Sequence, residues 1–286
     1  MTAPRSTLVP ALMMLTASLC WGASYLFMQK SLAEVGPCSL IVWRFGIAFV
    51  FSALLFPRTL FSATKAEWKH GLLLGVLLGI AFYAVMIGLR GTTTGNAGFL
   101  LGCTSVFVPL LCALKSRKWT FRILLAAAVS VSGIGLMTLQ SGFRLRPGDL
   151  FCMLSALLYS FYIILAGGFL RNDNPLRIGV IQFSGAAAAA GAGALISGET
   201  AFLPSTLPVW GEILFLGIFC SAAGFMLQMS AQKKLSPEYV SLLYSSEPVF
   251  AMILGLIFLA EPLSAGRLGG ASLILCGILL SSLRRK

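Results

Sequence analysis

Long apolar stretches separated by short polar segments follow one another along the whole chain. Ten of them are about 20 residues long, at positions 7–29, 36–56, 70–89, 94–114, 121–139, 149–169, 177–197, 210–230, 238–260 and 265–283. A helix needs about 20 mostly apolar residues to cross the hydrocarbon core of a bilayer. The pattern therefore predicts an all-α integral membrane protein with ten transmembrane helices. The first stretch resembles a signal peptide, but no charge interrupts it between Arg5 and Lys30, so we expect a retained helix.

The distribution of lysine and arginine predicts how these helices are oriented. If the N-terminus is inside, fifteen of the 21 basic residues fall in inner segments, five fall in outer loops, and Arg44 lies within a helix. Cytoplasmic loops of membrane proteins carry such an excess. We therefore expect a multi-pass protein of the cell (inner) membrane, with both termini cytoplasmic and an outer loop at residues 142–147. The net charge of +12 then mostly reflects this sidedness.

The two halves of the chain repeat one another weakly but in register. Positions 138 apart match at Leu19 and Leu157, Trp21 and Tyr159, Pro37 and Pro175, and Phe45 and Phe183. Positions 142 apart match at Trp68 and Trp210, Leu72 and Leu214, Gly75 and Gly217, and Ser130 and Ser272. One four-residue insertion between helices 7 and 8 reconciles the two offsets. The chain thus divides into two five-helix repeats, 1–142 and 143–286, and an odd number of helices makes them inverted. Inverted repeats are the usual basis of alternating access.

Composition excludes several classes of protein. Of the 286 residues, 58% are hydrophobic and 10% are charged, against about 25% charged in a soluble domain. A soluble enzyme, a disordered chain and a nucleic-acid-binding module are therefore excluded. The seven cysteines form no CxxC pair and His70 is the sole histidine, so we expect neither a disulfide framework nor a zinc site. There is no GxxxxGK, GxSxG or HExxH motif, so we expect no nucleotide, no cofactor and no enzyme activity.

Five short motifs resemble one known family. They are ASLCWGASY at 17–25, WRF at 43–45, GFL at 98–100 with VFVPLL at 106–111, EPVFA at 247–251, and LAEPLS at 259–264. In this order and spacing they resemble the EamA-type branch of the drug/metabolite transporter superfamily. The resemblance implies two EamA-like repeats, export of a metabolite, and a central cavity lined by helices 1–4 and 6–9, with helices 5 and 10 peripheral. One departure is Lys118-Trp119, where the family often has GE; the glutamate occurs only as Glu261.

Two charged residues lie deep within predicted helices, Arg44 in helix 2 and Glu247 in helix 9. Charges at membrane depth are costly and usually face the bundle interior or a wet cavity. Arg44 is a candidate for binding an anionic group, or alternatively forms a structural ion pair or snorkels to the interface. Glu247 is a candidate for substrate binding and proton coupling, because a partly dehydrated carboxyl can take up and release protons. Pro248 follows it, and broken helices at this depth commonly mark binding sites.

Uncharged polar and aromatic residues extend the candidate substrate site. All of them lie inside predicted transmembrane helices: Trp21, Tyr25, Tyr83, Asn96, Thr104, Tyr159, Tyr162, Gln182, Gln228 and Tyr244. For each of them, an interhelical hydrogen bond or simple packing is the structural alternative. Glycines recur at Gly71, Gly75 and Gly79, and a Gly/Ala stretch covers 185–194; both predict close helix packing.

These observations favour a secondary transporter for a small organic metabolite, an amino acid or related solute, driven by its own gradient or by protons. Two alternatives remain: a flippase for an amphipathic or lipid-linked substrate, and a non-transporting membrane subunit. The expected partners are a small-molecule substrate and membrane lipid, with no nucleic acid, and the protein is expected to be a monomer or homodimer.

Overall fold

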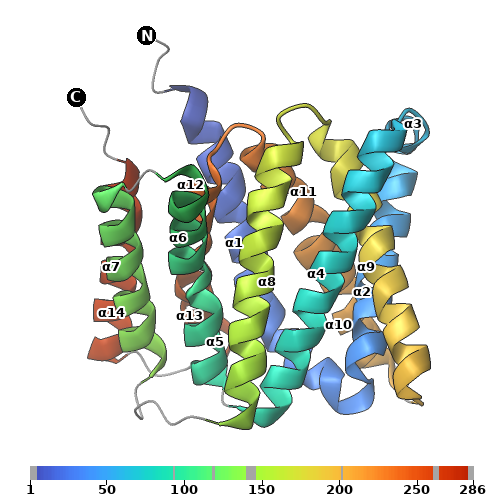
Figure 1. The fold of residues 1–286 in the computed structure, drawn as a ribbon. Coiled ribbons are helices and arrows are strands. Elements are labelled where there is room, and N and C mark those ends of the chain that lie inside the picture. Colours follow the sequence, from blue (N-terminus) through green and yellow to red (C-terminus); the bar gives the residue numbers. More distant parts are fainter. Residues whose placement is uncertain are drawn as a thin grey trace.

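The computed structural model is a bundle of helices that run between two opposite faces (Figure 1). It describes residues 5–92, 94–117, 120–139, 146–200, 202–259 and 264–282. The first half contains α1 (Arg5–Glu34), α2 (Pro37–Leu55), the short α3 (Pro57–Phe61), α4 (Lys65–Gly91), α5 (Thr94–Gly102), α6 (Thr104–Ser116) and α7 (Phe121–Thr138). The boundary predicted between the repeats, at 142 and 143, lies outside the described residues.

The second half follows the same order from the opposite face. It contains α8 (Pro147–Phe169), α9 (Pro175–Ser197), α10 (Leu207–Phe215), the π-helix η1 (Leu216–Ala223), α11 (Gly224–Gln232), α12 (Pro237–Tyr244), α13 (Glu247–Leu259) and α14 (Ala265–Ser282). Because α5 with α6, α10 with η1 and α11, and α12 with α13 each continue along one path across the bundle, the fourth, eighth and ninth spans are composite.

The prediction of ten membrane-crossing helices is confirmed. In the described residues, nine helical stretches are long and apolar enough to span a membrane, and Ala265–Leu280 forms a shorter tenth. Some helices extend beyond the apolar stretches. For example, α4 starts at Lys65, because a capping box begins it: Thr64 Oγ1 accepts a hydrogen bond from the Glu67 backbone at 3.2 Å, and Glu67 Oε2 accepts one from the Thr64 backbone at 2.8 Å.

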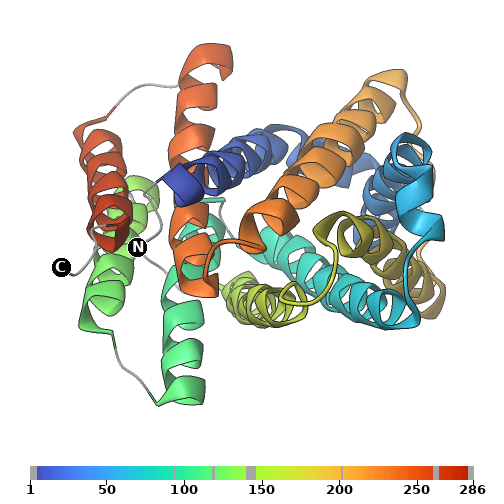
Figure 2. The same ribbon diagram turned by 90° about the horizontal axis from the view of Figure 1, so that it is seen from above.

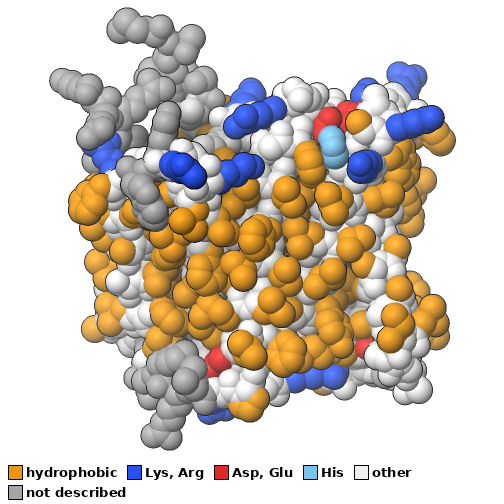
Figure 3. Space-filling model, in the orientation of Figure 1, with side chains coloured by type: hydrophobic (Ala, Val, Ile, Leu, Met, Phe, Trp, Pro, Cys, Tyr) orange, Lys and Arg blue, Asp and Glu red, His pale blue; other side chains and the backbone are white. Residues whose placement is uncertain are grey.

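The start of α1 and the end of α14 lie at the same face of the bundle (Figure 1). We call this the terminal face; it also carries α3 and the connections α8–α9 and α11–α12. The connections α1–α2, α4–α5 and α9–α10 lie at the opposite face. Lys and Arg side chains gather along the terminal face, and hydrophobic side chains cover the band between the two faces (Figure 3).

Helix contacts follow the inverted repeat. Helix α4 packs against α8 and α9, and its counterpart, the α10–η1–α11 span, packs against α1 and α2. The two self-related pairs, α2 with α9 and α7 with α14, also pack together. At the first of these pairs, Phe45 and its repeat mate Phe183 stack with ring centroids 6.1 Å apart. Seen from above, α7 and α14 form one end of the bundle, as the family resemblance implies (Figure 2).

The glycine stripe of α4 lets this helix approach α9 closely. A Cβ on Gly75 would lie 2.9 Å from the Ala186 nitrogen, and one on Gly71 would lie 2.7 Å from the Ile181 side chain. Gly217, the repeat mate of Gly75, likewise allows η1 to approach α2 closely, because a Cβ there would lie 2.7 Å from the Ile47 side chain. Small residues at such contacts are typical of membrane helices.

Candidate functional site

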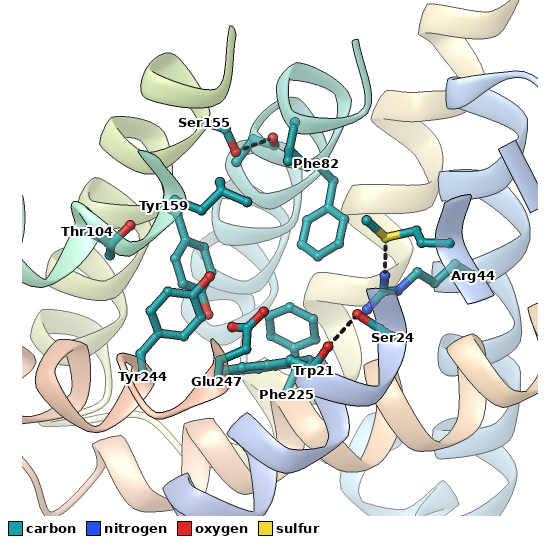
Figure 4. Close-up of a pocket in the computed structure, with 14 residues that line it drawn as sticks. Trp21, Ser24, Arg44, Phe82, Thr104, Ser155, Tyr159, Phe225, Tyr244 and Glu247 are labelled. Carbon is teal, nitrogen blue, oxygen red and sulfur yellow. Dashed lines mark hydrogen bonds between the residues drawn. The ribbon is translucent and has the colours of Figure 1, made fainter. Parts of the chain in front are cut away.

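A cavity of about 60 Å³ lies at the centre of the bundle (Figure 4). Seven of the ten spans contribute to its wall, through Trp21, Ser24, Met28, Arg44, Ala81, Phe82, Val85, Leu101, Thr104, Ser155, Tyr159, Phe225, Tyr244 and Glu247. The seventh span, α9, does not line it, which corrects the wall of helices 1–4 and 6–9 that the resemblance implies. Helix α9 lies behind the wall, because α2, α4 and α11 pack against it and themselves contribute residues to the cavity or to the spans that line it.

Two of the contributing spans are interrupted beside the cavity. The fourth span breaks at Cys103, between α5 and α6, and the ninth breaks at Ser245 and Ser246, between α12 and α13. Cys103 and Ser245 are repeat mates, so the two breaks are equivalent. Thr104 and Glu247 are the first residues of the helices that follow, where free backbone N–H groups and the helix dipole favour a negative charge.

The π-helix η1 holds two residues of the cavity wall. The Trp21 indole donates a hydrogen bond of 2.9 Å to the Cys220 carbonyl, and Arg44 Nε donates one of 2.6 Å to Ser221 Oγ. A π-helix shifts the backbone register, which releases carbonyls for such side-chain partners, and it occurs frequently at functional sites. Its counterpart in the first half, within α4, is regular α-helix, so the repeat does not predict it.

Arg44 is 1% exposed and is surrounded by neighbours. Besides Ser221, its Nη1 lies 3.3 Å from the Met28 sulfur, and its guanidinium carbon lies 4.8 Å from the centre of the Phe82 ring. The aromatic face stabilises the desolvated cation. The guanidinium group therefore has a fixed position at one side of the cavity, as Figure 4 shows.

Aromatic rings surround Glu247 in the wall of the cavity (Figure 4). Trp21 lies 5.0 Å from Phe225 and 5.8 Å from Tyr244 between ring centroids, and Tyr159 lies 5.4 Å from Tyr244. The carboxyl side chain points in among these rings and is 5% exposed. The cavity thus combines a cation, a carboxyl group and apolar ring surfaces.

The repeat explains why the cavity lies on the Arg44 side. The mate of Arg44 is Gln182, and the mate of Ser24 is Tyr162. The Tyr162 hydroxyl donates a hydrogen bond of 2.7 Å to Gln182 Oε1 and fills the space in the second half. In the first half the small Ser24 occupies the equivalent position, and its hydroxyl donates a hydrogen bond of 2.7 Å to the Trp21 carbonyl. The missing ring leaves room in front of Arg44.

The structure separates the candidate residues into three groups. Six line the cavity: Trp21, Arg44, Thr104, Tyr159, Tyr244 and Glu247. Three lie one layer behind it: Gln228, which accepts a hydrogen bond of 3.2 Å from Tyr159, and Tyr162 with Gln182. The side chain of Tyr25 lies outside the described residues.

Two candidates do not belong to this cavity. Tyr83 is 39% exposed on the outside of the bundle, because the neighbouring Phe82 takes the inward position on α4. Asn96 lies near the opposite face and contacts Asp149, with its Nδ2 3.3 Å from Oδ2. Asp149 also accepts a hydrogen bond of 2.8 Å from the Arg146 backbone at the start of α8, so this pair joins α5 to a helix end.

Sequence reasoning missed Ser24, Phe82, Ser155 and Phe225, which line the cavity. Phe82 and Phe225 are apolar and stand among many other apolar residues, so polarity could not single them out. The repeat offered one signal, because Ser24 is a small residue at the mate position of the large Tyr162.

An inverted repeat of membrane helices around a polar, partly aromatic central cavity is typical of membrane transport proteins. Comparison with known proteins gives the family. The chain belongs to the EamA-like transporter family, which matches it twice, over residues 8–139 and 146–283. The protein is therefore a membrane transporter of the EamA type.

Named relatives agree with this assignment, and a solved structure shares the fold. The uncharacterized transporter YyaM of Bacillus subtilis (strain 168) is 24% identical over 95% of this chain and 92% of its own length. An uncharacterized transporter of Archaeoglobus fulgidus is 26% identical over 93% of this chain and 83% of its own. A solved crystal structure is similar in fold, with a TM-score of 0.79, 19% identity and coverage of 98% of this chain and 97% of that one.

Proposed function

We propose that the protein is a secondary carrier that exports a small zwitterionic metabolite, an amino acid or a related solute, across the cell membrane by alternating access. The observation that carries the proposal is the presence of Arg44 and Glu247 in one small cavity with aromatic walls. A guanidinium group binds a carboxylate through a planar fork of donors. A carboxylate attracts an ammonium group, and the rings accommodate an apolar side chain.

Glu247 also supplies a route to proton coupling. A carboxylate can hold a proton or pair with an ammonium group, but a protonated carboxyl no longer attracts the cation. Protons that reach Glu247 from outside would therefore displace the bound solute, and the solute would bind again after the proton leaves inside. This competition exchanges protons for solute, which is the direction required for export.

Polar contacts at the terminal face are suited to closing the cavity on that side. Glu67 of α4 pairs with Arg177 of α9 at 3.1 Å. His70 of α4 lies 2.6 Å from the Asp173 carboxylate and stacks on Phe169 with ring centroids 4.0 Å apart. These contacts join the first half of the chain to the second, so an opening motion between the halves would break them.

A second set of contacts joins the halves at the opposite face. The Glu199 carboxylate accepts hydrogen bonds from the backbone of Cys38 at 3.2 Å and of Ser39 at 2.8 Å, at the start of α2. Glu34 accepts bonds from the Ser205 backbone at 3.1 Å and the Thr206 hydroxyl at 2.8 Å. A carrier that opens each face in turn would break one set while it keeps the other.

We further propose that the terminal face is cytoplasmic and that the halves 1–142 and 143–286 are the units that move. The excess of Lys and Arg at the terminal face supports this orientation. Maleimide labelling of single cysteines from one side of intact cells tests it. Modification from outside of a cysteine at position 171, in the α8–α9 connection, would contradict the orientation.

Uptake by proteoliposomes tests the transport proposal. Proteoliposomes in which the terminal face of the protein points outward turn export into uptake. With the wild-type protein they should accumulate at least one labelled amino acid from a panel, and Arg44→Gln should abolish this uptake. Lipid-flipping assays on the same vesicles should give no protein-dependent signal. Flipping without solute uptake would favour a flippase, and neither activity would favour a non-transporting subunit.

A further inference from the structure

An apolar groove lies on the outside of the bundle, along three of the seven spans that line the cavity. It encloses about 580 Å³ between α4, α6 and α8. Its walls include Leu73 and Leu77 of α4, Leu111 of α6, and Phe161 and Leu165 of α8. It lies on the face shown in Figure 3, where hydrophobic side chains predominate. In a bilayer this surface faces the acyl chains of the lipids.

The inverted repeat places larger side chains at three positions equivalent to this groove. The mates of Leu73, Leu77 and Leu165 are Phe215, Phe219 and Phe27. These three phenylalanines pack together there, with ring centroids 4.9 Å apart between Phe27 and Phe215, and 5.2 Å between Phe215 and Phe219. Large rings therefore occupy the equivalent space between α1 and the α10–η1–α11 span, whereas aliphatic side chains stand at these three positions of the groove.

The groove also has a charge at its end. Lys115 is the charged residue among the described residues that line the groove. It lies in the last turn of α6, toward the terminal face. The repeat mate of Lys115 is Ile257, which is 65% exposed and uncharged. The open groove and the cation thus occur together, with the cation at the end of the groove toward the terminal face.

We propose that this groove is a binding site for an anionic phospholipid, with an acyl chain along α4, α6 and α8 and the headgroup phosphate at Lys115. The apolar walls match an acyl chain, and the lysine is complementary to an anionic headgroup. Glu238, at the start of α12, lies within electrostatic range of the same part of α6. The Glu238 carboxylate reduces the attraction between Lys115 and an anionic headgroup. The preference of the site for anionic lipids depends on the part of this attraction that is left.

The groove lies directly behind the cavity wall. Ile80 lines the groove and its neighbour Ala81 lines the cavity, and on α8 Phe161 lines the groove while Tyr159 lines the cavity. A lipid held between α4, α6 and α8 would therefore bear on three spans that must move for the cavity to open. If the protein is the proposed carrier, the expected consequence is that anionic lipid binding is linked to the relative position of the two halves, because α4 and α6 belong to the first half and α8 belongs to the second.

Native mass spectrometry of the purified protein with added phosphatidylglycerol or phosphatidylcholine of identical acyl chains tests the site. We expect phosphatidylglycerol to bind about fivefold more tightly, which corresponds to one lysine acting near the membrane surface. Lys115→Gln should remove this preference. Lys234→Gln, which removes a charge from the α11–α12 connection at the same face, should preserve it. Equal binding of the two lipids by the wild type, or equal effects of the two substitutions, would overturn the proposal.

A second variant tests the groove itself. Leu73→Phe combined with Leu77→Phe installs the rings that the other half already carries and should weaken binding of both lipids. Thermal melting in the same detergent shows whether the variant is folded. Unchanged lipid binding by the folded double variant would overturn the proposal. So would a wild-type homodimer that this variant dissociates, because a second copy of the chain would then occupy the groove.

Discussion

At the scale of single residues, function depends on where the two halves differ. Arg44 and Gln182 hold equivalent positions, yet only Arg44 lines a cavity, because Ser24 leaves the space that Tyr162 fills in the other half. The cost of a buried charge at this depth is reduced by Ser221, Met28 and the Phe82 ring. These contacts hold the guanidinium group in place at one side of the cavity.

The fork geometry of Arg44 can be tested with Arg44→Lys. Lysine keeps the charge but loses the planar arrangement of donors. We expect the apparent affinity for substrate to fall about tenfold or more, as for the loss of a hydrogen bond to a charged group. Arg90→Lys, the same change at an exposed residue of α4, is the control and should have little effect. Parallel losses of transport and thermal stability in Arg44→Lys would assign Arg44 a purely structural role.

Proton coupling through Glu247 predicts a separation of two activities. Glutamine keeps the shape of the side chain but cannot titrate. Glu247→Gln should abolish accumulation driven by a pH gradient, whereas exchange of labelled for unlabelled substrate should persist. Glu238→Gln, in the same span near the terminal face, should retain both activities. If Glu247→Gln still accumulates substrate in response to a pH gradient, Glu247 does not carry the proton.

At the scale of elements, the number of helices and their repeat could be predicted from the sequence. The apolar stretches between charged residues give the number of helices, and matching positions in the two halves give the repeat. The sequence did not predict which face of a helix points inward. Tyr83 drew attention by its polarity, although Phe82 lines the cavity. The π-helix η1 was also missed, since its residues are as apolar as those of the regular helix α4, and the side chains that bond to it, Trp21 and Arg44, come from other helices.

The glycine stripe of α4 supports a stability prediction. Gly75→Val would place side-chain atoms against the backbone of α9, where a Cβ already meets the Ala186 nitrogen at 2.9 Å. We expect a loss of about 1–3 kcal/mol, the usual cost of overpacking. Gly46→Val, on α2, is the matched control, because nothing lies within 4 Å of a Cβ there. Equal shifts of the melting temperature in the two variants would show that helix propensity, rather than the α4–α9 contact, determines the loss.

At the scale of the whole molecule, polar contacts at the two faces connect the halves around one cavity. The terminal face is held by Glu67 with Arg177, and the opposite face by Glu199 with the start of α2. Alternating access requires these two sets to open in turn. Each set therefore contributes to the balance between two conformations, and weakening one should shift the population in a defined direction.

Paired substitutions test this balance. Glu67→Gln should make a cysteine placed at Thr104 more accessible to maleimide from the terminal face, and Glu199→Gln should make it more accessible from the opposite face. The measurement uses a background in which the native cysteines have been replaced. Changes in the same direction for both substitutions would contradict the assignment of the two contact sets.

Counterflow in proteoliposomes tests the central claim, that this protein is a carrier with one alternately exposed cavity, most directly. Vesicles preloaded with a high concentration of unlabelled substrate are diluted into a trace of labelled substrate, with no pH gradient. A carrier predicts that the label transiently accumulates above its external concentration, and that Arg44→Gln abolishes this overshoot. Entry of the label only to its external concentration, without an overshoot, would contradict the account, because it would indicate a channel open to both sides.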